Sequence, residues 1–198
     1  MLCPIQSFLI THSCKCHRLG SKHQSFVIKI DHYTIKSFVF DIDGVFTNGL
    51  ITVDSVGNES RSFSTKDGIA VKYAIEIGYN IAIISGAKNE GIRLRLNRLG
   101  VKNIFLGSNN KLKDLENYLK SNNLSKDDTV YMGDDIPDIS PMLVVGLSTC
   151  PFDAVPQVRD VSDYISPIKG GHGCVRDIIE QTLKVQKNWK LKNSNQNI

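Results

Sequence analysis

The chain reads KSFVFDIDGVFTNG over residues 36–49, where an apolar run stops abruptly at two acids. Phe38, Val39 and Phe40 are typical of a buried strand, while Asp41, Asp43 and the following glycine are not. Acids directly after a buried strand must lie at the edge of a sheet. This stretch therefore raises the question of which chemistry needs two carboxylates and a glycine at such an edge.

Strands and helices alternate along the rest of the chain. The predicted strands are IKSFVF (35–40), YNIAIIS (79–85), KNIFLG (102–107), TVYMGDD (129–135), LSTCP (147–151) and DYISP (163–167). The predicted helices are DGIAVKYAIEIG (67–78), KNEGIRLRLNRLG (88–100), NKLKDLENYLKSNN (110–123), DISPMLVVG (138–146), AVPQVRDVS (154–162) and GCVRDIIEQTLKVQKNW (173–189). The alternation predicts an α/β fold with a doubly wound, Rossmann-like parallel sheet covered by helices on both faces.

Two further runs break this alternation after the first strand. LITVD (50–54) and ESRSFS (59–64) alternate around SVGN, which predicts a β-hairpin. The domain is expected to span residues 34–189. Residues 1–33 lack periodicity and are expected to be an extension outside the fold, and residues 190–198 a polar, basic tail.

Composition excludes several classes of protein. The 198 residues carry a net charge of +4 and are 41% hydrophobic, which is ordinary for a soluble globular protein. No run approaches the roughly 18 apolar residues that span a membrane. The basic end, KVQKNWKLKNSNQNI (184–198), is typical of a solvated terminus, and no basic stripe interleaved with aromatics indicates nucleic-acid binding.

Cysteine usage indicates a reducing compartment. The five cysteines are an odd number, which favours the cytoplasm over an oxidising compartment. His12, Cys14, Cys16 and His17 cluster near the start, but they lack the paired CxxC spacing of a structural zinc site. We therefore expect no metal there.

Polar residues stand where several predicted strands end. In a doubly wound sheet, ligands bind outside the carboxyl ends of the strands. Each of these residues alone has an ordinary structural explanation, such as a helix cap, a turn or a solvent-facing lysine. Together, in chain order at one edge, they predict a functional site that contains Asp41, Asp43, Ser85, Gly86, Lys111, Asp134, Asp135 and Asp138.

Phosphoryl transfer is the chemistry that needs this set. A carboxylate can act as a covalent nucleophile through an acyl phosphate. Two carboxylates repel a phosphate unless a cation lies between them, and Mg²⁺ prefers oxygen ligands such as those of Asp41 and Asp134. Lys111 would neutralise charge on the transferring group, while Ser85 and nearby backbone N–H groups would hold its oxygens.

The motifs carry a family resemblance. DIDGVFTNG, IISG, Lys111 and GDDIPD resemble, in order, the four motifs of haloacid dehalogenase-like phosphatases. Within that superfamily, STKDG (64–68), YMGDDIPD and DYISPIKGGHGCVRDIIE resemble the branch of 3-deoxy-D-manno-octulosonate 8-phosphate phosphatases and related nonulosonate 9-phosphate phosphatases. The resemblance covers about residues 34–189.

The resemblance implies a role for each site residue. Asp41 is the nucleophile, and Asp43 protonates the leaving hydroxyl, later activates water, and offers its backbone carbonyl to Mg²⁺. Asp134 completes the protein's metal ligands, and Lys111 steadies the phosphoaspartate. Asp135 and Asp138 support the ligands from behind. The implied contacts to phosphate and substrate are Ser64, Thr65, Lys66, Asp67, Gly68, Lys72, Ser85, Gly86, Arg95 and Lys111.

No insert large enough for a cap domain is present. The hairpin at 50–63 stands in its place, and the resemblance implies a homotetramer in which a neighbouring subunit covers the site. Leu50, Ile51, Val53 and Phe63 offer the apolar surface for such contacts. The segment Pro167–Gly171 is expected to be flexible and to contribute in trans.

Two positions depart from the motifs of this branch and leave the identity of the sugar substrate undecided. Ala87 stands where this branch often has arginine, and Asn48 where it often has aspartate. The expected substrate is 3-deoxy-D-manno-octulosonate 8-phosphate, in lipopolysaccharide or other cell-surface carbohydrate synthesis, and a nonulosonate 9-phosphate (KDN or sialic acid) is the alternative. The rival from another class is a non-catalytic oligomerisation module, which has no need of the intact set Asp41, Asp43, Lys111 and Asp134.

Overall fold

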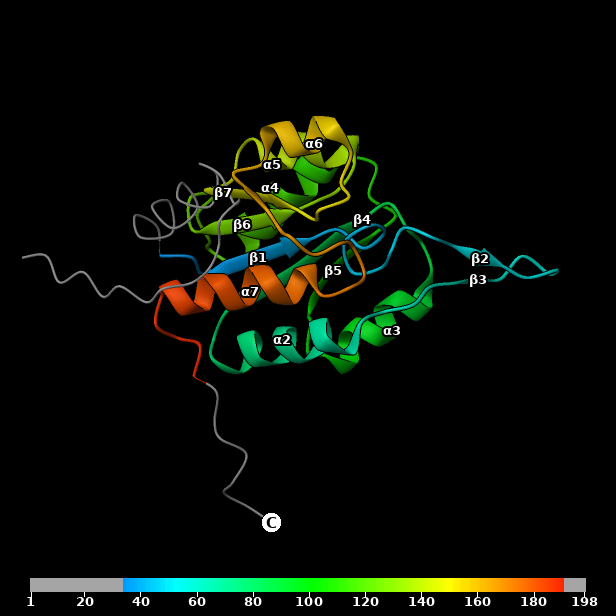
Figure 1. The fold of residues 1–198 in the computed structure, drawn as a ribbon, viewed down its shortest axis with the longest axis horizontal. Helices are drawn as coiled ribbons and strands as arrows, with labels where there is room; N and C mark the ends of the chain where they lie inside the picture. The colour runs from blue at the N-terminus through cyan, green and yellow to red at the C-terminus, as the bar shows by residue number, and fades with distance from the viewer. Residues whose placement is uncertain (1–33, 191–198) are drawn as a thin grey trace, which may run out of the picture.

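A computed structural model describes residues 34–190 of the chain, drawn in colour in Figure 1. The expectations for residues 1–33 and 191–198 lie outside the described residues. The strands are β1 (Ser37–Phe40), β2 (Thr52–Val53), β3 (Glu59–Ser60), β4 (Asn80–Ser85), β5 (Asn103–Leu106), β6 (Thr129–Met132), β7 (Leu147–Cys150) and β8 (Tyr164–Ile165). The helices are α2 (Thr65–Glu76), α3 (Glu90–Arg98), α4 (Lys111–Ser121), η1 (Ile136–Asp138), α5 (Ile139–Met142), α6 (Pro156–Val161) and α7 (Cys174–Val185).

The central sheet has six strands in the order β5-β4-β1-β6-β7-β8, and all its strand pairs are parallel. Without the hairpin, this is the doubly wound order 3-2-1-4-5-6, which confirms the predicted fold class. The order reverses between β1 and β6, so this pair flanks the crevice where such folds bind ligands. Phe40 of β1 pairs with Met132 of β6, which places Asp41 and Gly133 side by side just beyond the sheet.

Each face of the sheet carries its own core. Along β1, Phe38 and Phe40 pack into the core under α2, α3 and α7, while Val39 points to the opposite core under α4, α5 and α6. Figure 1 shows these two groups of helices on opposite sides of the sheet. Because successive side chains of a strand point to opposite faces, the unbroken apolar run of β1 is the pattern of a strand buried on both faces.

The hairpin forms a separate two-stranded antiparallel sheet, β2-β3, that projects beyond the carboxyl ends of the main strands (Figure 1). Its strands have two residues each and are shorter than the predicted runs. Leu50, Ile51 and Val53 are exposed as expected, and so is Val56. Phe63 is half-buried and so offers less apolar surface than the other three, because its ring packs on Phe46 with 6.3 Å between ring centroids.

Most remaining boundaries differ from prediction by a few residues, which is the usual uncertainty of helix ends. At 138–146 the predicted helix is shortened to the single turn α5, which ends at Met142 and is preceded by the 3₁₀ turn η1. Asp135 and Asp138 cap η1 reciprocally, with Pro137 inside it. No helix within residues 34–190 combines the length and the apolar character needed to cross a membrane.

Candidate active site

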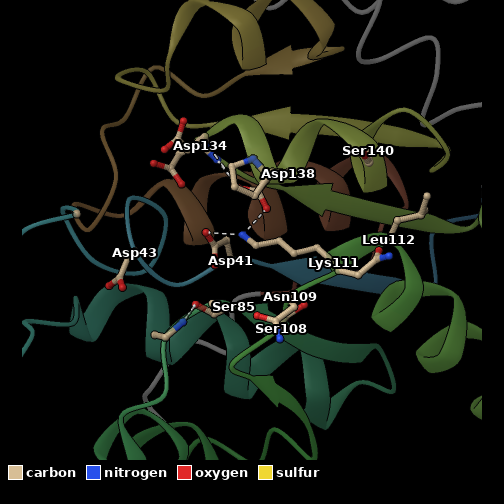
Figure 2. A pocket seen from close by; sticks show the side chains of 16 residues that line it. Asp41, Asp43, Ser85, Ser108, Asn109, Lys111, Leu112, Asp134, Asp138 and Ser140 are labelled. Carbon is tan, nitrogen blue, oxygen red and sulfur yellow. Dashed lines mark hydrogen bonds and ion pairs between the residues drawn. The ribbon is translucent and has the colours of Figure 1, made fainter.

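A cavity of about 600 Å³ opens at the carboxyl ends of the central strands. It lies where β1, β4 and β6 end and where α4 begins, as the doubly wound topology predicts. Figure 2 shows acids from β1 and β6 facing one lysine from α4 across this cavity. The residues lining it are Asp41, Asp43, Gly49, Ser85, Gly86, Ala87, Ser108, Asn109, Asn110, Lys111, Leu112, Asp134, Asp135, Pro137, Asp138 and Ser140.

Lys111 is the positive charge at the centre of the cavity. It is the first residue of α4, where the side chain of Asn110 caps the helix by accepting a hydrogen bond from the backbone N–H of Lys113. Its Nζ lies 2.8 Å from Asp41 Oδ2 and 2.7 Å from Asp138 Oδ1 (Figure 2). Burial disfavours the ammonium, yet the two acids outweigh that effect and raise the pKa of Lys111. The lysine therefore stays charged at neutral pH.

Asp138 orients this lysine from inside the protein. It is fully buried, and its Oδ1 also accepts a hydrogen bond from the Tyr131 hydroxyl at 2.8 Å. Its Oδ2 accepts from the backbone N–H of Asp134 at 3.3 Å. Both oxygens of Asp138 are thus engaged, as expected of a residue that supports the site from behind.

Asp41 and Asp134 have the free oxygens. Ligand atoms of Asp41, Asp134 and Asp138 all lie within 4.8 Å of one another. Oδ1 of Asp41 and Oδ1 of Asp134 are buried, and neither has a hydrogen-bond partner among the described residues. An orphaned buried carboxylate oxygen is costly unless a cation or donor satisfies it. Two of them side by side fit a hard cation such as Mg²⁺.

Electrostatics supports the same assignment. Burial, with the charges of Asp41 and Asp138, raises the pKa of Asp134 to about 8. Burial and the nearby Asp138 likewise raise the pKa of Asp41 to about 6, although Lys111 acts in the opposite direction. Both acids would be ionised at neutral pH only if a further positive charge lay between them.

The residue after the two acids of the first motif is Gly44, and it has no room for a side chain. A side chain on Gly44 would overlap the Asp134 carboxylate, and the residue has φ +89°. Gly133, before Asp134, is similarly restricted, because a side chain there would overlap that of Asp138. The glycine at 44 therefore lets the two acidic loops approach each other, and the glycine at 133 lets the second loop fold back on Asp138.

Asp43 lies toward the outer side of the cavity and is partly exposed. Its Oδ1 accepts hydrogen bonds from Arg61 Nε at 2.8 Å and from Thr47 Oγ1 at 3.1 Å. Sequence reasoning identified Asp43 but neither of these partners. Arg61 lies on the hairpin, 18 positions away, and carries no motif that would single it out.

The side of the cavity beside the ends of β4 and β5 contains both expected and unexpected residues. Ser85 ends β4, and its Oγ accepts a hydrogen bond from the backbone N–H of Ala87 at 3.3 Å (Figure 2). Ser85 and Gly86 line the cavity as expected. The polar run Ser108–Asn110 after β5 also lines it and was missed, although its place after a strand was a usable signal.

The remaining predicted substrate contacts lie elsewhere. Residues 64–68, Lys72 and Arg95 do not line this cavity. Asp67 is buried in α2, where its Oδ1 accepts a hydrogen bond at 2.7 Å from the backbone N–H of Arg176 at the start of α7. Burial raises the pKa of Asp67 to about 6. Arg95 reaches from α3 against Gly68. Their contact with substrate stays a prediction.

The glycines of the Pro167–Gly171 segment are held within their own chain. Gly171 donates its backbone N–H to Val45 O at 2.9 Å, and Gly170 donates to Asp153 Oδ1 at 2.9 Å. A side chain on Gly170 would overlap the Gly44 carbonyl. The expectation of a flexible segment is therefore wrong for these glycines, which brace the first acidic loop, whereas Lys169 is exposed.

The sequence and the fold are similar to those of known phosphatases. No family model matches the chain. The chain is 33% identical over 152 residues to the 3-deoxy-D-manno-octulosonate 8-phosphate phosphatase of Escherichia coli K12, covering 77% of this chain and 81% of that protein. The crystal structure of the Yersinia pestis phosphatase of the same name superimposes with a TM-score of 0.80 at 30% identity, over 83% of this chain and 88% of that one.

One of the similar structures contains a metal ion, phosphate and a sugar together. The 3-deoxy-D-manno-octulosonate 8-phosphate phosphatase of Moraxella catarrhalis was crystallised with a magnesium ion, a phosphate ion and a KDO molecule. It shares 33% identity with this chain and has a TM-score of 0.79, covering 83% of this chain and 94% of its own.

Proposed function

The chain belongs to the 3-deoxy-D-manno-octulosonate 8-phosphate phosphatase family of haloacid dehalogenase-like hydrolases, and from that premise we propose that it is a Mg²⁺-dependent phosphatase of this sugar phosphate. The observation that carries the proposal is the arrangement around Lys111. Its ammonium binds Asp41, while Asp41 and Asp134 each keep a buried oxygen that has no hydrogen-bond partner within residues 34–190. A structural module has no need of such a costly cluster.

Asp41 is the nucleophile. One of its carboxylate oxygens attacks phosphorus, the bond from phosphorus to the sugar oxygen breaks, and a phosphoaspartate forms. Asp43 gives its proton to the departing oxygen and then accepts a proton from the water that hydrolyses the phosphoaspartate. Lys111, already 2.8 Å from Asp41 Oδ2, offsets negative charge on the transferring group.

Asp41, Asp134 and the backbone carbonyl of Asp43 would hold the magnesium ion. When bound, the ion supplies Lewis-acid charge that lets two carboxylates and a phosphate share one site. Asp138 keeps Lys111 directed at Asp41, and Asp135 stays at the exposed rim, where its Oδ1 caps η1 through Ile136 N–H at 2.7 Å.

Ser85 and the polar loop Ser108–Asn110 hold the phosphate. Ser85 is buried at the end of β4, and its Oγ accepts a hydrogen bond from the backbone N–H of Ala87 in the following turn. Hydrogen-bond donors placed in advance around a phosphoryl group stabilise charge in the transition state without needing to reorganise.

The biological setting belongs to the same proposal. We place the reaction in the cytoplasm, in lipopolysaccharide or related cell-surface carbohydrate synthesis. We also infer a homotetramer, because Leu50, Ile51, Val53 and Val56 leave an apolar hairpin exposed beside an open site. The nine-carbon alternative rests on Ala87, which lines the cavity without the positive charge that arginine would bring.

A phosphate-release assay tests the proposal. The purified chain is given 3-deoxy-D-manno-octulosonate 8-phosphate, a nonulosonate 9-phosphate and glucose 6-phosphate, each with Mg²⁺ and with chelator. We expect the highest kcat/KM for the eight-carbon ester, and no turnover in chelator. Preference for the nine-carbon ester would reassign the substrate, and failure on all three would support a non-catalytic module.

A further inference from the structure

Arg61 reaches from the hairpin back to the acidic loop. It follows β3, and its Nε lies 2.8 Å from Asp43 Oδ1. Although most of the hairpin is exposed, the Arg61 side chain is only 5% exposed. An arginine is seldom so well covered unless its guanidinium is paired.

The guanidinium is held from two directions. While Nε binds Asp43, Nη1 binds Glu59 Oε2 at 3.0 Å. Because the guanidinium group is planar and rigid, two partners on different nitrogens fix both its place and its orientation. Arg61 is therefore a fixed donor toward Asp43 and not a mobile surface charge.

Thr47 binds the same oxygen of Asp43. Its Oγ1 lies 3.1 Å from Asp43 Oδ1, and the Thr47 side chain is buried in the acidic loop. Oδ2 of Asp43 makes no hydrogen bond with any residue within 34–190. The carboxylate thus has one oxygen bound by two donors and one oxygen free. Since Oδ1 is occupied by donors, a proton on Asp43 must reside on Oδ2.

Asp43 also lies at the border of two hollows. It lines the cavity that contains Asp41 and a second hollow of about 630 Å³, which includes Arg61, Lys88 and Asn89. A phosphate ester bound at Asp41 would have its leaving oxygen at this border. The free oxygen of Asp43 is therefore the one available to that leaving group.

We propose that Arg61 is a positioning residue for the leaving-group step: by binding Oδ1 of Asp43, it turns Oδ2 toward the oxygen that departs. The inference rests on the proposed function. In that step the proton on Oδ2 moves to the leaving oxygen, the bond from that oxygen to phosphorus breaks, and the bond from Asp41 to phosphorus forms. Arg61 itself exchanges no proton and touches no reacting atom.

The test compares two leaving groups in Arg61→Ala. A sugar alkoxide needs a proton as it departs, whereas p-nitrophenolate leaves without one. The ratio kcat/KM reports the steps up to phosphoryl transfer to Asp41 and is insensitive to later hydrolysis. We expect kcat/KM to fall about 30-fold for the sugar phosphate and less than about threefold for p-nitrophenyl phosphate.

Three further variants separate a positioning role of Arg61 from a general effect on the protein. Arg61→Lys keeps the charge and should recover part of the loss on the sugar phosphate. Thr47→Val removes the second donor with little change of shape, so it should repeat the selective loss even if Arg61→Ala folds poorly. Arg93→Ala removes an arginine that pairs with Glu90, donates to Ile104 O and lines neither of the two hollows at Asp43, so it should leave both rates unchanged.

Equal losses on both esters in Arg61→Ala and Thr47→Val would overturn the inference and assign these residues a structural role. In that case an active wild-type protein would leave the proposed function intact. A wild-type protein that hydrolyses neither ester would overturn the proposed function and the inference together.

Discussion

The carboxylate of Asp134 occupies the space into which a side chain at Gly44 would project. The two residues lie 90 positions apart in sequence, yet their loops meet at the carboxyl ends of β1 and β6. Gly44→Ala should therefore displace Asp134, and we expect magnesium affinity and turnover to fall at least about 100-fold. Isothermal titration with Mg²⁺ and a phosphate-release assay measure the two effects.

Gly78→Ala is the matched control. Gly78 also has positive φ, at +97°, but a side chain there would meet no atom within 4 Å. This variant should lose about 1–2 kcal/mol of stability through backbone strain and retain wild-type magnesium binding. Similar magnesium affinity in the two variants would show that the Gly44 contact is unimportant.

Asp41→Asn removes the nucleophile. Turnover should fall at least about a thousandfold, and acid quenching with mass spectrometry should find no phosphorylated protein. Because burial raises the pKa of Asp41 to about 6, removing its charge should leave the metal-free melting temperature unchanged or higher. A folded variant with near-normal phosphate release would disprove this assignment.

Magnesium should stabilise the protein more at pH 8 than at pH 6. Burial and the neighbouring acids raise the pKa of Asp134 from 3.8 to about 8, so the metal-free native state binds more protons than the unfolded chain between these pH values. Its stability should therefore fall as the pH rises through that range. Magnesium replaces the proton, so its apparent affinity should drop about tenfold per pH unit below 8.

Thermal unfolding with millimolar Mg²⁺ or with chelator, at both pH values, measures this effect. Asp134→Asn is the control and should lose most of the magnesium-induced shift at both values. A shift in the wild-type protein that is larger at pH 6 than at pH 8 would contradict the proposed ligand.

The exposed hairpin should mediate assembly. Ile51 and Val53 are 43% and 60% exposed, and burying such apolar area between subunits is favourable. The double variant Ile51→Asp, Val53→Asp should give smaller species by light scattering and lose at least about tenfold in kcat/KM, since the site would stay open to water. Phe63 is unsuitable for this test because its ring packs on Phe46 in the core.

Ile69→Asp provides the comparison for the hairpin variant. Ile69 is 61% exposed on α2, outside the hairpin. Its substitution by aspartate should change neither the assembly of the protein nor its rate. Monomeric hairpin variants with wild-type efficiency would mean that each subunit is complete alone.

Local sequence pattern was sufficient to predict the layers of the fold. Strands buried on both faces read as apolar runs such as that of β1, and the helices between them show their own periodicity. Once the sheet is parallel and doubly wound, the carboxyl ends of its strands must share one edge. The strand pattern therefore predicts one shared site for the polar residues at these ends, and they line one cavity: Asp41, Ser85, Lys111 and Asp134.

Contacts between segments far apart in the chain could not be predicted from the sequence. Nothing local to Arg61 indicates that it binds Asp43, and nothing local to Asp67 indicates that it is buried against the start of α7. Likewise, nothing local to Phe63 indicates that its ring packs on Phe46. In each case packing partners, which no local pattern encodes, decide the environment of the side chain.

The sequence by itself determined the order of strands and helices, the acids at the strand ends and the lysine that faces them, because these follow from periodicity and from the geometry of parallel sheets. Only the tertiary structure decided which oxygens are free. Asp138 is engaged by Lys111 and Tyr131, whereas Asp41 and Asp134 each keep an oxygen that no residue of the described part of the chain binds. That difference depends on burial and on distances of a few ångströms between segments far apart in the chain, and such distances arise only when the core packs.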